Sequence, residues 1–147
     1  MAHFMLYKIE DVGFHINKEY DYESFQQKDL VINISNQLQI NKEFASMQVK
    51  VEYLDSNDCQ LVSQELKYIF KGDFTDCYIT QGEDGGNKKD KINSLMLTFS
   101  NIIIGGIRGV IFIKTIDHPV LSKYVLPLIS PDLLKKKMIT NIKEKQE

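Results

Sequence analysis

The sequence predicts an α+β fold in which one face of a four-stranded antiparallel sheet is covered by a long helix and a short C-terminal helix. Two patterns carry this prediction. Up to about residue 80, apolar and polar residues alternate with the period of a strand, in segments separated by short polar turns. From about residue 90 the apolar residues recur every three or four positions, which is the period of a helix.

The composition indicates one folded domain over residues 1–147. Hydrophobic residues make up 43% of the 147 positions, which is enough for a core. The 18 basic and 20 acidic side chains give a net charge of −2. This balance argues against a nucleic-acid partner, which would need a basic surface.

The N-terminal part of the chain contains the first strands. Residues 5–16 alternate weakly and predict a short strand or an extended arm, whereas residues 17–28 have no period and predict a loop. Residues 30–40 place apolar residues at even positions, and residues 47–54 place them at odd positions. Because a strand points alternate side chains to opposite faces, both segments have one face for the core and one for water.

Short polar segments join these strands. Residues 41–43 and 55–58 are predicted turns, the second because Asp, Ser and Asn side chains bond their own backbone. Residues 59–71 predict a third strand, and residues 74–80 are a candidate fourth strand. A flexible polar loop is predicted over residues 81–89. Such short connections are typical of antiparallel hairpins with one face exposed to water.

One long helix is predicted over residues 90–115, with Asp90 as its N-cap. Gly105 and Gly106 argue against it, since each costs about 1 kcal/mol in a helix interior. Paired glycines also let another backbone come close. Polar and charged residues interrupt the apolar stretch, so we expect it to be buried and not inserted in a membrane.

All three prolines follow this helix. Pro119 ends it, and residues 121–129 form an apolar linker. Ser130 and Pro131 can cap and start a short last helix. We expect residues 143–147 to be a frayed tail.

Catalytic and metal-binding patterns are missing from the sequence. Cys59 and Cys77 have no CxxC spacing, and no signal peptide precedes the first strand, so we expect two free thiols in the cytoplasm. The histidines are isolated, and the carboxylate pairs at 10–11 and 83–84 have no nucleophile beside them. The protein is therefore expected to be no enzyme and to need no metal or cofactor.

Apolar and aromatic side chains exceed what one helix layer of a small domain readily covers. Either all of them belong to the core, or the remainder forms an exposed groove for an extended polypeptide or for another subunit. Under the second interpretation the candidate peptide-binding residues are Tyr53, Tyr68, Phe70, Phe74, Tyr78, Phe99, Tyr124 and Leu126.

Four segments, in their order along the chain, resemble the SecB-like protein-export chaperone family. They are KIEDVGF at 8–14, FKGDF at 70–74, IRG at 107–109 and YVLPLI at 124–129. The chain departs from the family where Pro-Tyr is replaced by Gly105-Gly106 and where Glu is replaced by Gly109. It therefore resembles a divergent member.

The resemblance implies an ATP-independent holding chaperone for unfolded or pre-secretory polypeptides, assembled as a homo-oligomer (dimer or tetramer) with the long helices at subunit contacts. Family members dock the SecA motor on an acidic outer sheet face. Here that face is mixed, with Lys50, Glu52, Glu65 and Lys67, which argues against SecA and leaves it only a candidate partner. Divergent members guard dedicated clients such as antitoxins. A structural or assembly subunit with one fixed protein partner is the alternative from another class.

Overall fold

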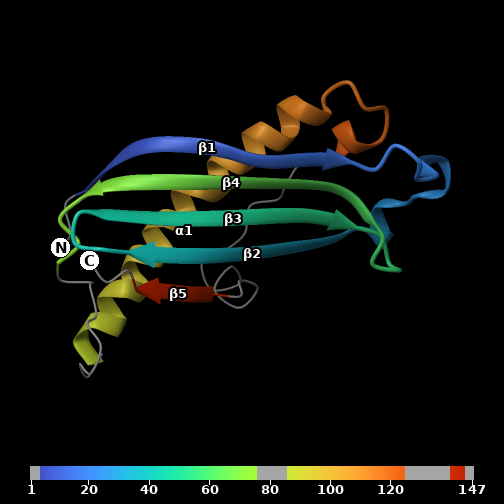
Figure 1. Cartoon of the computed structure of the whole chain (residues 1–147). Helices are drawn as coiled ribbons and strands as arrows, with labels where there is room; N and C mark the ends of the chain where they lie inside the picture. The colour runs from blue at the N-terminus through green and yellow to red at the C-terminus, as the bar shows by residue number, and fades with distance from the viewer. Residues whose placement is uncertain (1–3, 76–85, 125–139, 145–147) are drawn as a thin grey trace.

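The computed structural model describes residues 4–75, 86–124 and 140–144, which form one sheet crossed on one face by a long helix (Figure 1). The strands are β1 (Phe4–Ile16), β2 (Val31–Ile40), β3 (Phe44–Leu54), β4 (Gln60–Gly72) and β5 (Thr140–Glu144). The helix is α1 (Gly86–Thr115), and the short 3-10 turns are η1 (Tyr22–Ser24), η2 (Gln27–Asp29) and η3 (Leu121–Lys123).

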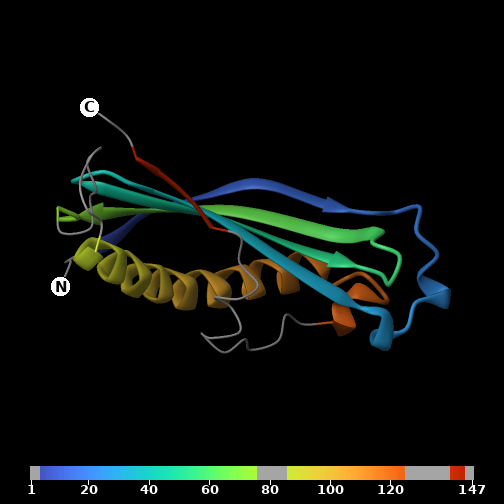
Figure 2. The same ribbon diagram turned by 90° about the horizontal axis from the view of Figure 1, so that it is seen from below.

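The sheet order is β1-β4-β3-β2-β5. The pairs β1–β4, β4–β3 and β3–β2 are antiparallel, and the pair β2–β5 is parallel. In the view from below, α1 lies against one face of the sheet, and the other face carries no helix among the described residues (Figure 2). The predicted α+β class, with four antiparallel strands under one long helix, is confirmed.

The fourth antiparallel strand is the N-terminal one. Strand β1 spans 13 residues, so the alternative of an extended arm is wrong. The candidate strand over residues 74–80 is wrong where it can be judged, because Phe74 and Thr75 lie beyond the end of β4. The rest of that range lies outside the described residues.

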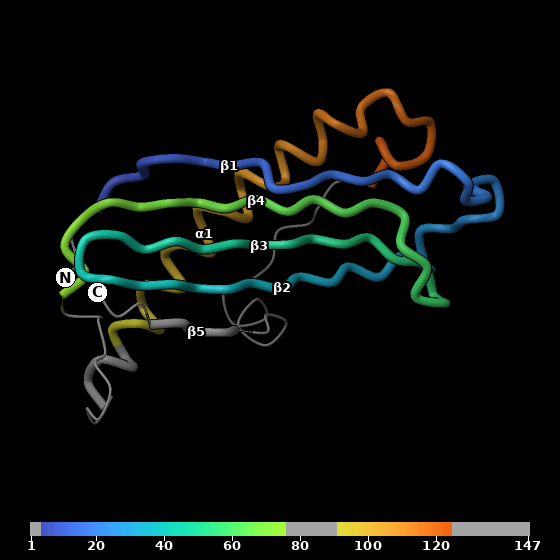
Figure 3. The backbone as a smooth tube through the Cα atoms, viewed as in Figure 1, coloured from blue at the N-terminus to red at the C-terminus, as the bar shows by residue number. Residues whose placement is uncertain are grey.

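Two irregularities explain why β1 alternates weakly in the sequence. Its pairing with β4 shifts register between Leu6 and Lys8 and again between Asp11 and Gly13. Tyr7 and Val12 are therefore bulge residues, and each reverses the parity of the residues that follow. Even so, β1 runs beside β4 along its whole length (Figure 3).

The predicted alternation of the central strands is confirmed. The residues that face α1 are buried, and they include Ile34, Leu38 and Ile40 on β2 and Met47, Val49, Val51 and Tyr53 on β3. The predicted turns also form, and their side chains hold them. Asn41 Oδ1 accepts from the backbone N–H groups of Glu43 and Phe44 at 2.9 and 2.6 Å. Asp55 Oδ1 accepts from those of Asn57 and Cys59 at 2.9 and 2.8 Å.

Helix α1 ends at Thr115 as predicted, but it begins at Gly86, so Asp90 lies inside it and is not its N-cap. The predicted loop over residues 81–89 is therefore wrong for residues 86–89, which belong to the helix. By length and composition Lys91–Thr115 is apolar enough to cross a membrane. Its buried side chains nevertheless pack on the sheet, as a core helix does. They are Ile92, Leu95, Phe99, Ile103, Ile104, Ile107 and Ile111.

The C-terminal predictions are only partly visible. The last helix and most of the linker lie outside the described residues. The frayed tail is wrong for Lys143 and Glu144, which pair with Gln39 and Ile40 in β5. These residues are ordered because they pair with the open edge of β2; a five-residue segment has no core of its own to hold it in place. One domain over residues 1–147 stays a prediction.

Candidate functional site

The structure places five of the eight candidate peptide-binding side chains in the core. Tyr53, Tyr68, Phe70, Phe74 and Phe99 are each at most 3% exposed. The Phe70 and Phe99 rings stack with centroids 4.0 Å apart, joining β4 to α1. Burial raises the pKa of Tyr53 to about 12. These rings hold the helix on the sheet and are closed to a client in this conformation.

The other three candidates are less defined. Tyr124 is partly buried and meets Phe25 edge to face, with centroids 5.5 Å apart. Tyr78 and Leu126 lie outside the described residues. A peptide-binding role for the eight residues therefore stays a prediction.

The exposed apolar side chains lie elsewhere. Of the ten large apolar side chains exposed in the described part of the chain, nine belong to β1, to α1 or to the residue that follows α1, and Val31 is the tenth. We call these nine the apolar flank. Its members are Met5, Leu6, Tyr7, Ile9, Val12, Ile102, Phe112, Ile113 and Ile116, the last just beyond the end of α1. Its members on α1 lie in the C-terminal half of the helix, the half that passes β1 in Figure 1.

Helix α1 carries two apolar stripes. One packs on the sheet. The second faces solvent and consists of Ile102, Gly105, Gly109, Phe112 and Ile116, spaced three, four, three and four residues apart. This is the spacing of a helix–helix seam. This second stripe was not predicted from the sequence, although its spacing can be read there.

Strand β1 is an edge of the sheet, so one side of its backbone has no strand partner among the described residues. Leu6 and Ile9 pair with the buried Phe70 and Tyr68, which places them on the face that α1 covers. Both remain exposed because α1 crosses the sheet obliquely and leaves that part of β1 uncovered. The edge therefore presents apolar side chains beside unpaired backbone groups.

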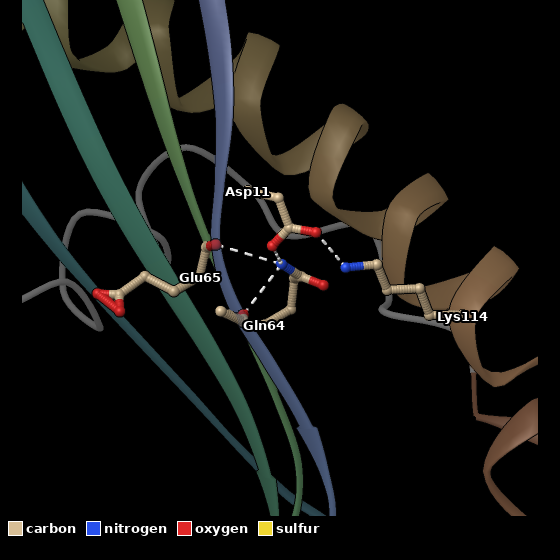
Figure 4. Close-up of polar contacts among 5 residues, drawn as sticks. Asp11, Gln64, Glu65 and Lys114 are labelled. Carbon is tan, nitrogen blue, oxygen red and sulfur yellow. Dashed lines mark hydrogen bonds and ion pairs between the residues drawn. The ribbon is translucent and has the colours of Figure 1, made fainter.

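A polar cluster joins β1 to α1 inside this apolar surrounding (Figure 4). Lys114 Nζ donates to Asp11 Oδ2, and it lies 4.8 Å from the centroid of the Phe14 ring. Gln64 Nε2 donates to Asp11 Oδ1 at 2.8 Å and to the Gly13 carbonyl at 3.1 Å. The Lys114 hydrogen bond holds the pKa of Asp11 below its usual range. The cluster fixes where the end of α1 lies over the edge strand.

Gly106 lies directly against Tyr68 of the sheet. A Cβ atom at this position would lie 1.9 Å from Tyr68 Oη, whereas one at Gly105 would meet nothing within 4 Å. The expectation that the glycine pair permits close packing holds for Gly106, but its neighbour is a side chain and not a backbone. Tyr68 thus occupies the space that a side chain at position 106 would fill.

The outer face of the sheet is polar and of mixed charge. Lys50 Nζ lies 4.0 Å from Glu52 Oε1, and Gln48 Nε2 donates to Glu65 Oε1 at 2.8 Å. A shallow hollow of about 210 Å³ there includes Lys67 and Phe44 in its lining. This face is not an acidic docking surface.

The titratable side chains near the far end of α1 serve structural contacts. His118 Nδ1 accepts from the backbone N–H groups of Val120 and Leu121 at 3.2 and 2.9 Å, and burial lowers the pKa of His118. Asp55 Oδ2 accepts from the Tyr20 hydroxyl at 2.9 Å. In the described ranges no three His, Cys, Asp or Glu side chains gather in a way that could hold a metal ion.

Comparison with solved structures finds the same fold in the Mycobacterium tuberculosis SecB-like chaperone Rv1957, solved in complex with a ChAD peptide from the HigA1 antitoxin. The TM-score is 0.52 at 10% sequence identity, over 86% of this chain and 88% of that chain. A protein of unknown function from Streptococcus agalactiae has a TM-score of 0.38 at 13% identity, over 87% of this chain and 99% of that chain. No family model and no curated protein sequence matches. This chain therefore has a SecB-like fold with a divergent sequence.

Proposed function

We propose that this chain, given its SecB-like fold, is an ATP-independent holding chaperone of the cytoplasm that binds unfolded polypeptides. The apolar flank is the observation that carries the proposal. Large exposed apolar patches on a soluble domain mark surfaces that bind other chains. An extended client can lie along this patch and gain apolar contacts from it.

Self-association is part of this proposal. The exposed stripe of α1 has the spacing of a helix seam, and Gly105 and Gly109 leave room for a second helix at its centre. Phe112 and Ile116 of this stripe are 40% and 51% exposed in the single chain, and fully burying one such side chain contributes about 1.5–3 kcal/mol. We expect a dimer or tetramer through α1, with the β1 part of the flank left for clients.

A dedicated client fits better than general export. The structural relative was solved with an antitoxin peptide, which makes an antitoxin-type client the first to test. The mixed outer face, with Lys50 beside Glu52, gives no acidic site for SecA. Pre-secretory clients and SecA docking are therefore the weaker form of the proposal.

Light scattering of a chemically unfolded client, diluted from denaturant without nucleotide, tests the holding activity. The wild-type chain should suppress aggregation at a near-stoichiometric ratio. Tyr7→Lys should weaken suppression because it puts a charge into the flank. His15→Lys is the matched control, an exposed position of β1 outside the flank. A folded wild-type chain that suppresses nothing would contradict general holding.

That negative result would favour the structural or assembly subunit. The discriminating measurement is then a pull-down from the native cell. One partner recovered in constant stoichiometry supports the assembly subunit, whereas a varied client set supports the chaperone.

Self-association has its own test. Phe112→Glu should reduce the mass measured by light scattering after size exclusion, because it buries a charge in the seam. Asn93→Glu is the matched control, on an exposed position of α1 outside the stripe. A wild-type monomer at micromolar concentration would contradict the helix seam.

A further inference from the structure

The two edges of the sheet differ in regularity. On one edge, β1 contains two bulges, which are a common protection against strand addition. At the other edge, β5 covers only part of β2, and β2 pairs with β3 from Val31 to Ile40 without a single shift. Its sequence, VINISNQLQI, contains no charge, glycine or proline. A long, regular and uncharged edge strand is a template for another strand.

The hydrogen bonding of β2 shows which backbone groups face that edge. Asn41 N–H donates to the Phe44 carbonyl at 2.9 Å, which closes the hairpin with β3. Backbone groups alternate in direction along an antiparallel strand, so those of odd residues in β2 face β3 and those of even residues face outward. Asn36, Leu38 and Ile40 meet β5 there. The groups of Ile32 and Ile34 meet no strand among the described residues.

Strand β5 shows that the edge accepts an extended segment. It is five residues long, β2 is its one strand partner among the described residues, and it is parallel, the weaker pairing per residue. It covers Asn36–Ile40 and leaves Val31–Ser35 uncovered by any described strand. A longer strand in its place would pair along all of β2.

We propose that the β2 edge is a strand-acceptor site for an extended client segment and that β5 is its resident strand, displaced on binding. This rests on the proposed holding function and adds its mode of recognition. Side chains of an added strand would lie alternately beside Ile34 and Leu38 and beside Ser35 and Gln37. The site therefore selects segments that alternate apolar and neutral polar residues and carry little charge.

A reversible disulfide tests the displacement in the full-length chain. Gln37 and Asn141 are register partners, and adjacent strands lie about 4.8 Å apart, within the span of a disulfide. Gln37→Cys and Asn141→Cys are introduced together with Cys59→Ser and Cys77→Ser. The probe is a fluorescent, permanently unfolded polypeptide, reduced and carboxymethylated α-lactalbumin. Oxidation should weaken its binding about tenfold or more, and reduction should restore it.

Deletion provides the opposite perturbation. Removing residues 140–147 should tighten binding about threefold or more, because the competent state is then always populated. Removing only 145–147 is the matched control and should change nothing. Hydrogen exchange should also show that the Ile32 and Ile34 amides become protected when the probe binds.

The outcomes separate the two proposals. Equal binding by the oxidised, reduced and shortened chains, without protection of those amides, overturns the strand-acceptor site and leaves the holding function standing. A shortened chain that pairs with itself through these amides overturns the client assignment in favour of a second copy. No binding by any form refutes the holding function and this site together.

Discussion

A methyl group at Gly106 tests how closely α1 lies on the sheet. In Gly106→Ala the new Cβ would be 1.9 Å from Tyr68 Oη and 3.2 Å from Tyr68 Cζ. Tyr68 is only 3% exposed, so its ring has little room to move away. Either the ring shifts within the core or α1 lifts from β4.

Two opposing effects set the magnitude. Alanine is about 1 kcal/mol better than glycine inside a helix. Overpacking a core by one carbon costs about 1–3 kcal/mol. The net loss in the free energy of unfolding should be about 0–2 kcal/mol. In a Tyr68→Phe background the hydroxyl is gone and the nearest ring carbon gives only a tight contact, so the same substitution should gain about 0.5–1 kcal/mol.

The double-mutant cycle isolates the contact because helix propensity cancels between the two backgrounds. We expect a coupling energy of about 0.5–3 kcal/mol between positions 68 and 106. Urea unfolding of the four proteins, followed by far-UV circular dichroism at one protein concentration, measures it. A coupling near zero would show that Tyr68 does not lie against Gly106 and would refute this placement of α1.

Three further predictions concern polar groups and backbone strain. Lys114→Met should raise the pKa of Asp11. In the wild type, the ionised Asp11 stabilises the fold above its ordinary pKa of about 4, and this stability is lost as the pH falls. Urea unfolding should therefore show a smaller loss of stability from pH 5 to pH 3 in the variant than in the wild type. His118 has a lowered pKa, so its contribution is complete above about 6.5 and is lost as the pH falls; His118→Gln should flatten the change in melting temperature between pH 7.5 and 5.5. Asp58 has a φ of 63°, so Asp58→Gly should add about 0.5–1 kcal/mol to the free energy of unfolding, and an unchanged urea midpoint would contradict the strain.

The period of the apolar residues predicts an element correctly where one face of the element is buried and its register is regular. In β2 and β3, all the apolar residues from Ile34 to Tyr53 that the alternation predicts to point inward are buried. It was weakest for β1, because the bulges at Tyr7 and Val12 scramble the alternation that identifies a strand. The start of α1 was also wrong. An acidic residue is favoured both at an N-cap and near the N-terminus inside a helix, so Asp90 alone does not separate the two positions.

The candidate site was harder to predict than the fold. An aromatic residue such as Phe70 or Phe99 has the same pattern whether it lines an open groove or stacks under a helix, and only the packing decides. Strand β5 could not be predicted from its own five residues, because its order depends on the open edge of β2 far away in the sequence. The exposed stripe of α1, in contrast, can be read from the spacing of Ile102 to Ile116 in the sequence.

The two bulges of β1 have a consequence for solubility. Cross-β assembly needs strands that match one another residue by residue over their whole length. Copies meeting at β1 can keep such a match only over the short run from Lys8 to Asp11, because Tyr7 and Val12 interrupt the ladder on either side. Fibril growth along this edge would stall after a few hydrogen bonds. The apolar residues of β1 can therefore be exposed to water without making this edge a nucleus for aggregation.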